Sequence, residues 1–473
     1  MSRSQKTSWR YRLLLAVAGT VTVAALAVGL FKPDPRRSFV AKPPSTAETS
    51  SVSEAQSTAE ARAIGEVQTT AETPVAAAVS TNLPVFRRGI NLSRQQSFSR
   101  RDPDRQGAYL WPPFSDDLAQ ISDSELEKLR LLGFDFIRLP VDAGPFLAES
   151  KPHEKILLED LKQLVGRLHG AGFSVLLDVH PAIYSSVWTP KDILADPKGP
   201  KYERYEAFLL TLAGLFHDLP AKTFALELMN EPQPQCVNPD GEDWTVAQKR
   251  LYDVVRAKAP DLPLVLTGGC WSSADGLVKV DPGMFDGNTL YDFHFYDPYP
   301  FTHQSQYWAS PPTRYLAGLS YPAESGSPER TIELSRQHLA RMADKGDPQP
   351  SNALAKAKRE IRHYYGSLRP DQAYLSRRFD VVGDWAKDHG ISPDRIVVGE
   401  FGAVRLQDYT PDDGSRLRWL KDVRIVAEQH GFGWSLWDYL GGFGLVSDYK
   451  TRDIDAGMAG ALGLDVSKAD PQD

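Results

Sequence analysis

The sequence contains very little cysteine: Cys236 and Cys270 are the only two in 473 residues. Neither belongs to a Cys/His cluster with the spacing of a zinc site, so we expect no metal and no other cofactor. In an oxidising compartment such a pair is a disulfide candidate, and the alternative is two unrelated thiols.

The sequence also has no excess of positive charge. Its formal net charge is −7 and no basic stripe stands out, which argues against a nucleic-acid partner. A hydrophobic content of 41% allows one sizeable domain with a large core, plus attachments. The 10 Trp and 18 Tyr residues fit either core packing or surfaces that stack sugar rings, and composition alone does not choose.

One long stretch has no charged residue at all. Residues 13–31, LLLAVAGTVTVAALAVGLF, follow four basic residues and are about as long as a membrane-spanning helix, which needs roughly 20 residues. A cleaved signal peptide is the alternative, because Ala25-Leu26-Ala27 resembles a cleavage site. We expect residues 1–31 to be a signal anchor that contacts the membrane. In either case the body is periplasmic or extracellular, held by its N-terminus or secreted.

Residues 32–83 have almost no aromatic side chains and consist largely of Ala, Ser, Thr, Glu and Pro. Such a composition cannot bury enough apolar surface to offset the entropy of ordering, so we predict a disordered tether. The globular domain is expected over residues 84–473.

The body alternates short apolar runs with helical stretches. The eight strand candidates are 86–93, 134–141, 173–180, 223–230, 262–269, 290–297, 395–402 and 431–438. Apolar residues recur at helical spacing over 154–170, 201–217, 243–259 and 414–430. Eight β-then-α units predict an α/β fold of the (β/α)8 barrel type. The runner-up is a doubly wound open sheet, which the lack of a glycine-rich turn after the first strand disfavours.

Local signals support the helix boundaries. Ser122 and Glu125 form a capping-box pattern, and Gly133, Gly172 and Gly431 follow helices where a terminal glycine belongs. The interval 298–394 between the sixth and seventh strands is too long for a plain loop, so we predict a partly helical insertion. Its helices are expected near 328–344, 352–366 and 374–389.

Polar residues gather at the carboxyl ends of the predicted strands, where a (β/α)8 barrel builds its active site. They are Arg138, His180, Asn230, Glu231, His294, Tyr296, Glu400 and Trp437. Each comes from an independent segment or strand end, so a set of this size is hard to obtain by chance.

The two glutamates lie on strands at opposite sides of the barrel mouth. Retaining glycoside hydrolysis needs two carboxyl groups about 5–5.5 Å apart, one protonated and one ionised. Arg138 would keep Glu400 ionised, and Tyr296 could donate a hydrogen bond to the same carboxylate. Asn230 could hold a sugar hydroxyl, and Trp437 offers a flat face to a pyranose ring.

Each of these residues also has a structural interpretation. Both glutamates could sit in structural ion pairs, and Arg138 could be the buried partner of a structural acid. His180 could be a core histidine, or with Asp178 a metal ligand, although a metal-dependent barrel hydrolase needs more ligands than these strand ends supply.

Further aromatic residues lie in the loops at the same end of the barrel. Trp271, Trp308, Trp188, Trp244 and Tyr184 are each either a sugar subsite or packing under a loop. Cys236 and Cys270 fall in the loops after the fourth and fifth strands, which are neighbours in a barrel, and this placement supports a disulfide.

The motifs LMNEP, HFY, VVGEFG and WSLWDY resemble glycoside hydrolase family 5, the cellulase family. The resemblance covers about residues 86–465, except most of 298–394. It implies that Glu231 is the acid/base and Glu400 the nucleophile of a retaining β-glycosidase. It further implies an endo-β-1,4-glucanase that acts on cellulose or a bacterial exopolysaccharide.

Other interpretations stay open at this point. The polymer could be β-mannan, β-1,3-glucan or an acidic exopolysaccharide, the barrel could be an inactive sugar-binding protein, or the hydrolase could depend on a metal. An anchored enzyme could also trim a polymer alongside the exopolysaccharide synthesis or export machinery rather than digest food.

Overall fold

The computed structural model describes residues 83–469, apart from 116–119, 186, 234–242 and 407–408. The predicted anchor, nearly all of the predicted tether and Cys236 therefore lie outside the described residues. Within the described part of the chain, no helix is both long and apolar enough to cross a membrane.

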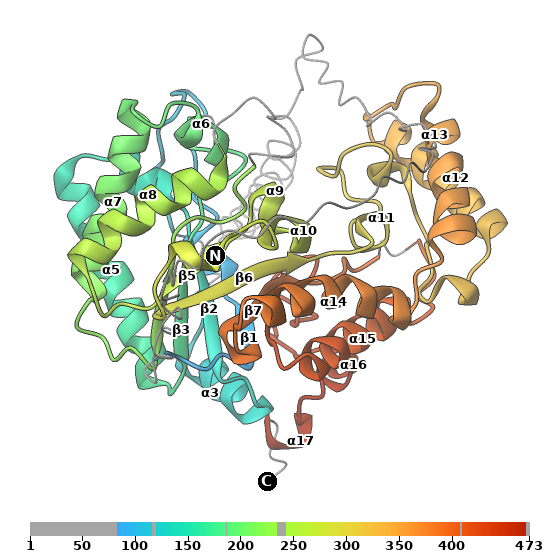
Figure 1. Ribbon diagram of the computed structural model, residues 1–473. Coiled ribbons are helices and arrows are strands. Elements are labelled where there is room, and N and C mark those ends of the chain that lie inside the picture. The colour runs from blue at the N-terminus through green and yellow to red at the C-terminus, as the bar shows by residue number, and fades with distance from the viewer. Residues whose placement is uncertain (1–82, 116–119, 186, 234–242, 407–408, 470–473) are drawn as a thin grey trace, which may run out of the picture. The chain divides into compact units, whose positions relative to one another are not determined.

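Eight parallel strands close into a barrel in the order β1 to β8, which confirms the (β/α)8 prediction (Figure 1). The strands are β1 Arg88–Asn91, β2 Phe136–Val141, β3 Ser174–Val179, β4 Phe224–Glu227, β5 Leu264–Thr267, β6 Thr289–Phe295, β7 Ile396–Phe401 and β8 Gly433–Leu436. Each lies within its predicted run, except that β6 begins one residue earlier. The open-sheet alternative is wrong because β1 pairs with β8.

Helices follow the strands around the barrel. They are α2 Ser93–Gln96, α3 Asp123–Leu132, α4 Ala143–Ala148, α5 Lys151–Gly170, α6 Pro190–Leu194, α7 Pro200–Phe216, α8 Trp244–Lys258, α9 Gly269–Ser272, α10 Ala274–Leu277, α11 Tyr299–Thr302, α12 Pro328–Asp344, α13 Ala353–His363, α14 Gln372–Asp388, α15 Ser415–Gln429, α16 Ala456–Ala461 and α17 Val466–Ala469. The helical stretches predicted from periodicity correspond to α5, α7, α8 and α15.

The terminal signals behave as predicted. The Ser122 amide donates to Glu125 Oε2 at 2.7 Å, and the Glu125 amide donates to Ser122 Oγ at 3.2 Å, which completes the capping box at α3. Gly133 ends this helix with φ 107°, a conformation that a residue with a Cβ rarely adopts.

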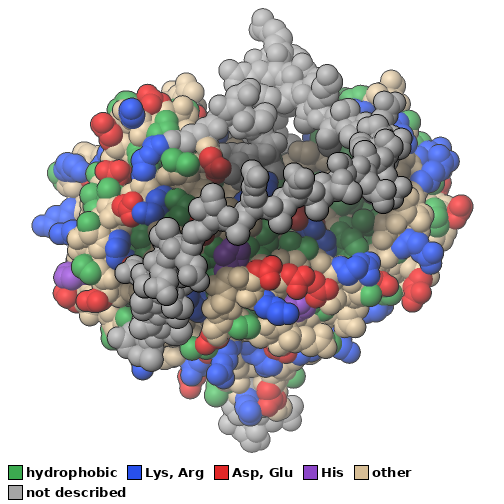
Figure 2. All heavy atoms as spheres, in the orientation of Figure 1, with side chains coloured by type: hydrophobic (Ala, Val, Ile, Leu, Met, Phe, Trp, Pro, Cys, Tyr) green, Lys and Arg blue, Asp and Glu red, His purple; other side chains and the backbone are tan. Residues whose placement is uncertain are grey.

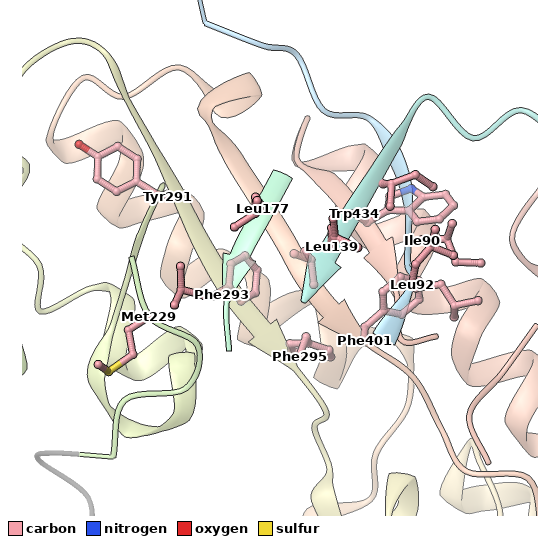
Figure 3. Close-up of a cluster of buried hydrophobic side chains, with 14 of the residues drawn as sticks. Ile90, Leu92, Leu139, Leu177, Met229, Tyr291, Phe293, Phe295, Phe401 and Trp434 are labelled. Carbon is pink, nitrogen blue, oxygen red and sulfur yellow. The ribbon is translucent and has the colours of Figure 1, made fainter. Parts of the chain in front are cut away.

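Buried apolar side chains form two clusters because successive residues of a strand face opposite sides. The larger cluster lies between the strands and the helices, and Figure 3 labels Leu139, Leu177 and Phe293 within it. The smaller cluster comprises Phe86, Phe136, Leu176, Ala225, Val265, Leu290 and Val397, which come from the strands or the segment just before β1. The two clusters take alternate residues of the same strands, so the smaller one fills the barrel interior.

The segment between β6 and β7 holds four α-helices, α11 to α14, and several shorter helical turns. α12 and α13 pack against each other, whereas α14 packs on α10 and α15 in the ring of helices that surrounds the barrel. Hydrogen bonds tie the segment to the chain after β7: Ser320 Oγ donates to Asp413 Oδ2 at 2.6 Å, and Tyr321 Oη donates to Asp422 Oδ2 at 2.8 Å.

Two strands, β4 and β8, end earlier in the chain than predicted, so site residues expected at their ends lie in the loops that follow. β4 ends at Glu227, so Asn230 and Glu231 follow it, and β8 ends at Leu436, so Trp437 follows it. Glu231 adopts φ 42°, in the left-handed region, so a continued strand is impossible at that residue.

On the face seen in Figure 2, acidic and basic side chains are interspersed over the described residues.

Candidate active site

A layer of polar side chains lies directly above the apolar cluster in the barrel. Four charged residues each come two residues after a member of that cluster: Arg138, Asp178, Glu227 and Asp292. Because side chains two residues apart on a strand face the same side, these four also point into the barrel interior. All four are fully buried. The site is therefore built on a layer of buried charges rather than on apolar packing alone.

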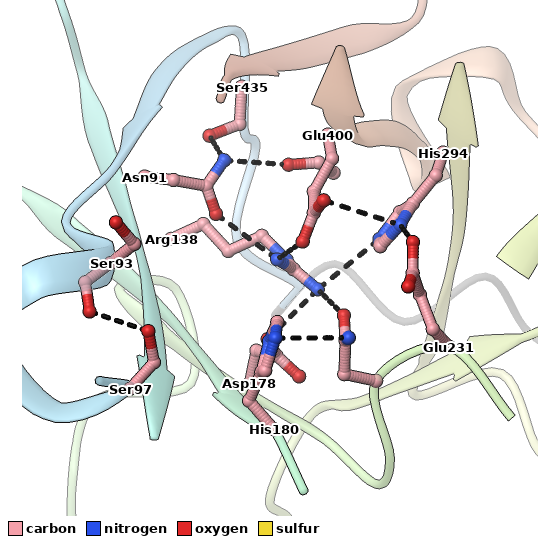
Figure 4. A network of polar contacts seen from close by, with 12 residues as sticks. Asn91, Ser93, Ser97, Arg138, Asp178, His180, Glu231, His294, Glu400 and Ser435 are labelled. Carbon is pink, nitrogen blue, oxygen red and sulfur yellow. Dashed lines mark hydrogen bonds and ion pairs between the residues drawn. The ribbon is translucent and has the colours of Figure 1, made fainter. Parts of the chain in front are cut away.

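Arg138 is the centre of this layer (Figure 4). Its hydrogen-bond and ion-pair partners include Asn91, Asp178, Glu227, Asn230, Asp292 and Glu400. Glu227 receives two hydrogen bonds from the guanidinium, each 3.1 Å long. One guanidinium thus faces four carboxyl groups, and burial raises the pKa of Asp178, Glu227 and Asp292.

Glu400 on β7 has a donor on each of its oxygens. Arg138 Nη1 donates to Oε1 at 2.8 Å, and Tyr296 Oη donates to Oε2 at 2.8 Å. Both contacts were predicted from the sequence. Two donors on one carboxylate fix its position and can stabilise its negative charge when it acts as a nucleophile and leaves again.

Glu231 lies in a different environment. Its side chain is 21% exposed, and burial raises its pKa to about 7, against the opposing influence of His180 and Arg138. Its Oε1 lies 2.9 Å from His294 Nδ1. A carboxyl group with this pKa carries a proton over much of the neutral range, as a general acid must.

His294 bridges the two glutamates. Its Nε2 faces the Arg138 guanidinium at 3.4 Å and so acts as an acceptor, which places the ring proton on Nδ1. Nδ1 then donates to Glu231 Oε1 and also lies 3.6 Å from Glu400 Oε2. Burial lowers the pKa of His294 to about 3, which favours the neutral ring.

The two carboxyl groups approach each other closely. One oxygen of Glu231, one of Glu400 and a nitrogen of His294 all lie within 4.8 Å of one another. Retaining glycosidases place their carboxyl groups about 5–5.5 Å apart, whereas inverting enzymes need about 6.5–9.5 Å to admit a water molecule. The approach of one oxygen from each carboxyl group to within 4.8 Å favours the shorter spacing, which suits direct attack by one carboxylate.

His180 and Trp437 line another side of the site. His180 Nδ1 donates to Asp178 Oδ2 at 2.7 Å, and its Nε2 accepts from Asn230 Nδ2 at 3.2 Å. The Trp437 ring is stacked on the imidazole, with centroids 5.9 Å apart and planes 12° apart. Asn230 Oδ1 meanwhile accepts from Arg138 at 3.0 Å, so all the predicted residues on this side are held in one network.

Among the residues that the structure describes, three groups of side chains offer ligand atoms near enough for a metal ion. They are Asp178, His180 and Glu400; Glu227, Asp292 and His294; and Glu231, His294 and Glu400. In the first group, Asp178 and Glu400 already pair with Arg138 at 3.0 Å and 2.8 Å. The guanidinium thus occupies the position of a cation between these carboxylates.

The outer aromatic residues differ in how exposed their side chains are. Trp308 is 49% exposed and stands edge-on to His303, whose ring in turn contacts Tyr296, so a row of rings leads from the site to Trp308. Trp271 is 40% exposed after β5, and its amide donates to Pro232 O at 3.0 Å. Trp244 is fully buried at the start of α8, so of its two interpretations the packing role holds.

The predicted disulfide stays a prediction, because Cys236 lies outside the described residues. No free cysteine is found among the residues that are described. The hydrogen bond from the Trp271 amide to Pro232 O shows that the described residues just after β4 and β5 contact each other.

Sequence reasoning missed several buried residues of the network. Asn91 at the end of β1 donates to Gly399 O at 2.9 Å and accepts from Arg138 at 3.1 Å. Glu227 and Asp292 face the guanidinium from β4 and β6. Their signal was available, because an acidic residue inside an otherwise apolar strand needs a buried partner.

The sequence is similar to a family of known proteins. The family model described as Cellulase (glycosyl hydrolase family 5) matches residues 115–441. Endoglucanase C of Acetivibrio thermocellus is 23% identical over 364 residues, which cover 75% of this chain and 91% of that protein. Endoglucanase 3 of Fibrobacter succinogenes is 24% identical over 357 residues, which cover 73% of this chain but only 49% of that protein, so the chain spans about half its length.

The barrel is also similar to solved structures. The clostridial cellulose synthase subunit Z of Clostridioides difficile superimposes with a TM-score of 0.56 at 19% identity, covering 80% of this chain and 99% of that one. At this level of identity the likeness concerns the fold.

A closed parallel barrel with two close carboxyl groups at its mouth defines a hydrolase of the glycosidase class. The chain belongs to glycosyl hydrolase family 5, since the family model covers well over half of it. It is an endoglucanase-like glycosidase.

Proposed function

We propose that the protein is a retaining endo-β-1,4-glucanase that acts on cellulose or a bacterial exopolysaccharide. The observation that carries this proposal is the pair of carboxyl groups within 4.8 Å, with Glu400 held by two donors and the pKa of Glu231 raised to about 7. The endoglucanase names of the curated relatives support the choice of a β-1,4-glucan.

In the first step, a Glu400 oxygen attacks the anomeric carbon while Glu231 gives its proton to the leaving glycosidic oxygen. The bond to the leaving sugar breaks as the bond to Glu400 forms, so a covalent glycosyl-enzyme results. His294 stays neutral and its Nδ1–H stabilises the carboxylate that Glu231 becomes.

In the second step, Glu231 takes a proton from a water molecule, which attacks the same anomeric carbon. Glu400 leaves as a carboxylate, and Arg138 and Tyr296 stabilise its returning charge. Two inversions at one carbon give a product with the starting configuration.

The substrate polymer is proposed to run past the aromatic rings at the barrel mouth. Trp437 is assigned the sugar at the reacting carbon, and Trp308 and Trp271 are assigned sugars further out. The insertion 298–394 supplies Trp308, so we assign it a role in selecting the polymer. Trp308 and Trp271 are 49% and 40% exposed, and exposed rings on both outer positions favour attack within a chain rather than at its end.

A panel of soluble polysaccharides tests the proposal. We expect the protein to cut a β-1,4-glucan with a rapid fall in viscosity, as endo-acting enzymes do. Cleavage of β-mannan or β-1,3-glucan alone would reject the linkage, and cleavage of nothing in the panel would favour a sugar-binding barrel.

The raised pKa of Glu231 predicts a specific pH dependence. Because only the protonated acid can donate, kcat/KM for a cello-oligosaccharide should fall about tenfold per pH unit above about 7. A dinitrophenyl cellobioside serves as the matched control, since its leaving group needs no proton and its kcat/KM should stay flat there. Equal falls for both substrates would show that another group titrates.

The cellular setting is a further part of the proposal. Residues 1–31 would anchor the enzyme, 32–83 would tether it, and the body would work in the periplasm or outside the cell. A tethered glucanase suits trimming of a polymer during its synthesis or export, and the similar Clostridioides difficile protein is named as a subunit of a cellulose synthase. A deletion that alters neither polymer length nor yield would reject this role.

An acidic polysaccharide is the second candidate substrate, and a row of arginine and aromatic side chains favours it. Arg94 lies over the Phe98 ring at 4.4 Å, Phe98 is stacked on Tyr184 at 6.1 Å, and Arg101 lies over Tyr184 at 5.1 Å. Within the described residues, neither arginine has a carboxylate partner within 4.0 Å. The row is close to the site because Ser93, next to Arg94, is hydrogen-bonded to Asp438, next to Trp437.

Replacing both arginines tests this candidate. For an acidic polymer, Arg94→Gln with Arg101→Gln should lower kcat/KM on carboxymethylated β-1,4-glucan by about tenfold, because each charge-assisted bond is lost. Activity on a neutral β-glucan should change less than about twofold. Arg100→Gln is the matched control, since Arg100 is exposed and its Nη2 donates to Pro112 O outside the row. Equal losses on both polymers would reject the acidic substrate.

A further inference from the structure

The strand that carries Glu400 is irregular at one residue. In the pairing of β6 with β7, Phe293 lies opposite Val398 and His294 lies opposite Glu400, so Gly399 is an extra residue. Such a bulge shifts the alternation of side chains by one position. Val397 faces the barrel interior, and regular alternation from it would place Glu400 toward the helices and Phe401 toward the interior. Because Gly399 is an extra residue, Phe401 instead faces the helices and Glu400 faces the interior.

Side chains from two other strands hold the peptide groups of Gly399. Asp292 Oδ1, on β6, accepts from the Gly399 amide at 2.6 Å. Asn91 Nδ2, on β1, donates to the Gly399 carbonyl at 2.9 Å. Both side chains are fully buried, and both also contact Arg138, the partner of Glu400.

The space around Gly399 is filled on the side where a Cβ would sit. A Cβ atom at this position would lie 2.1 Å from Asp292 Oδ2, far inside contact distance. Glycine is therefore required here by the carboxylate that binds its amide. The bulge and Asp292 fit together as one unit.

We propose that Asn91 and Asp292 are positioning residues that clamp the bulge at Gly399 and thereby aim the Glu400 carboxylate at the substrate. The inference rests on the proposed function, in which Glu400 is the nucleophile. In this proposal neither residue touches the sugar. Each acts through the backbone of Gly399, the residue that precedes Glu400. Loss of the clamp lets β7 relax toward regular pairing and turns Glu400 away from the anomeric carbon.

The first test compares a disruptive and a conservative change of Asp292. Asp292→Ala removes the acceptor of the Gly399 amide, so kcat on dinitrophenyl cellobioside should fall about 100-fold with KM changed less than about threefold, as a misplaced reactant predicts. Asp292→Asn keeps an acceptor oxygen and should retain kcat within about tenfold of wild type. Equal losses in the two variants would overturn the clamp, since the charge rather than the hydrogen bond would matter.

The second test asks whether Asp292 acts through Glu400. In Glu400→Ala, azide can enter the vacated space and attack the anomeric carbon, which releases dinitrophenolate and forms a glycosyl azide. Adding Asp292→Ala to this variant should leave the azide-dependent rate nearly unchanged, because no carboxylate remains to be aimed. A further 100-fold fall would show a general effect on the site and overturn the proposal.

Two outcomes separate this proposal from the function it rests on. If Glu400→Ala without azide keeps wild-type activity, the proposed nucleophile is wrong. If Glu400→Ala is inactive and rescued by azide while Asp292→Ala and Asn91→Ala both have wild-type kcat, only the clamp is wrong. Thermal unfolding is recorded for each variant, and Asn91→Ala, which removes the donor to the Gly399 carbonyl, replaces Asp292→Ala should the latter not fold.

Discussion

Glu400→Gln should lower kcat on a soluble β-1,4-glucan by about 10⁴-fold or more, because the amide cannot form the glycosyl-enzyme. The change keeps the size of the side chain, and the amide oxygen can accept from Arg138 while the amide NH2 donates to the Tyr296 hydroxyl. The fold should therefore survive, with an unfolding temperature within a few degrees of wild type. Steady-state kinetics and thermal unfolding on the same samples check both parts.

Glu231→Gln provides the matched comparison for this prediction. Its loss on the polymer should be about 10²–10⁴-fold, the range for a missing general acid. On dinitrophenyl cellobioside the first step should proceed almost normally, whereas Glu400→Gln should fail on both substrates. If the two variants lost activity equally on both substrates, the separate roles assigned to the glutamates would be wrong.

Arg138→Met should produce the largest loss of stability. It removes the guanidinium that faces Asp178, Glu227, Asp292 and Glu400 and leaves their buried charges without a partner. Removing one partner of a buried ion pair costs about 3–5 kcal/mol of unfolding free energy. Denaturant unfolding at pH 8 measures this loss, and kcat should fall sharply as well.

The same loss should shrink as the pH falls. Burial holds the pKa values of Asp178 and Glu227 above their ordinary range, so between the unfolded and folded pKa values the folded protein binds more protons than the unfolded chain. This contribution makes the folded state less stable as pH rises through that window. Protonated carboxyl groups need the guanidinium less, so Arg138→Met should be closer to wild type at pH 5 than at pH 8. A loss that is independent of pH would contradict this description of the charge layer.

Much of the fold and of the candidate site could be predicted from the sequence. The eight strands are visible because apolar runs alternate with helical periodicity, and the site residues are visible because parallel strands bring their carboxyl ends together. Even the contacts of Arg138 and Tyr296 with Glu400 follow from charge and placement.

The rest depends on pairing and packing that a single strand does not reveal. The bulge at Gly399 exists only relative to β6, so no local pattern in VVGEFG marks it. Trp244 stands at the very start of the expected helix 243–259, where the sequence groups it with the loop aromatics. Its ring is in fact buried, and its Nε1 donates to Thr267 O. β4 ends at Glu227, before Asn230 and Glu231, and the left-handed backbone of Glu231 keeps the strand from resuming at that residue.

Trapping the covalent intermediate tests the central claim most directly. A 2-deoxy-2-fluoro cellobioside with a dinitrophenyl leaving group slows the second step, so the glycosyl-enzyme should accumulate, and mass spectrometry of its peptides should locate the sugar. We predict one equivalent of sugar bound to Glu400, none in Glu400→Gln, and release of a product with the β configuration. A sugar on another residue, or a product of inverted configuration, would contradict the double-displacement mechanism.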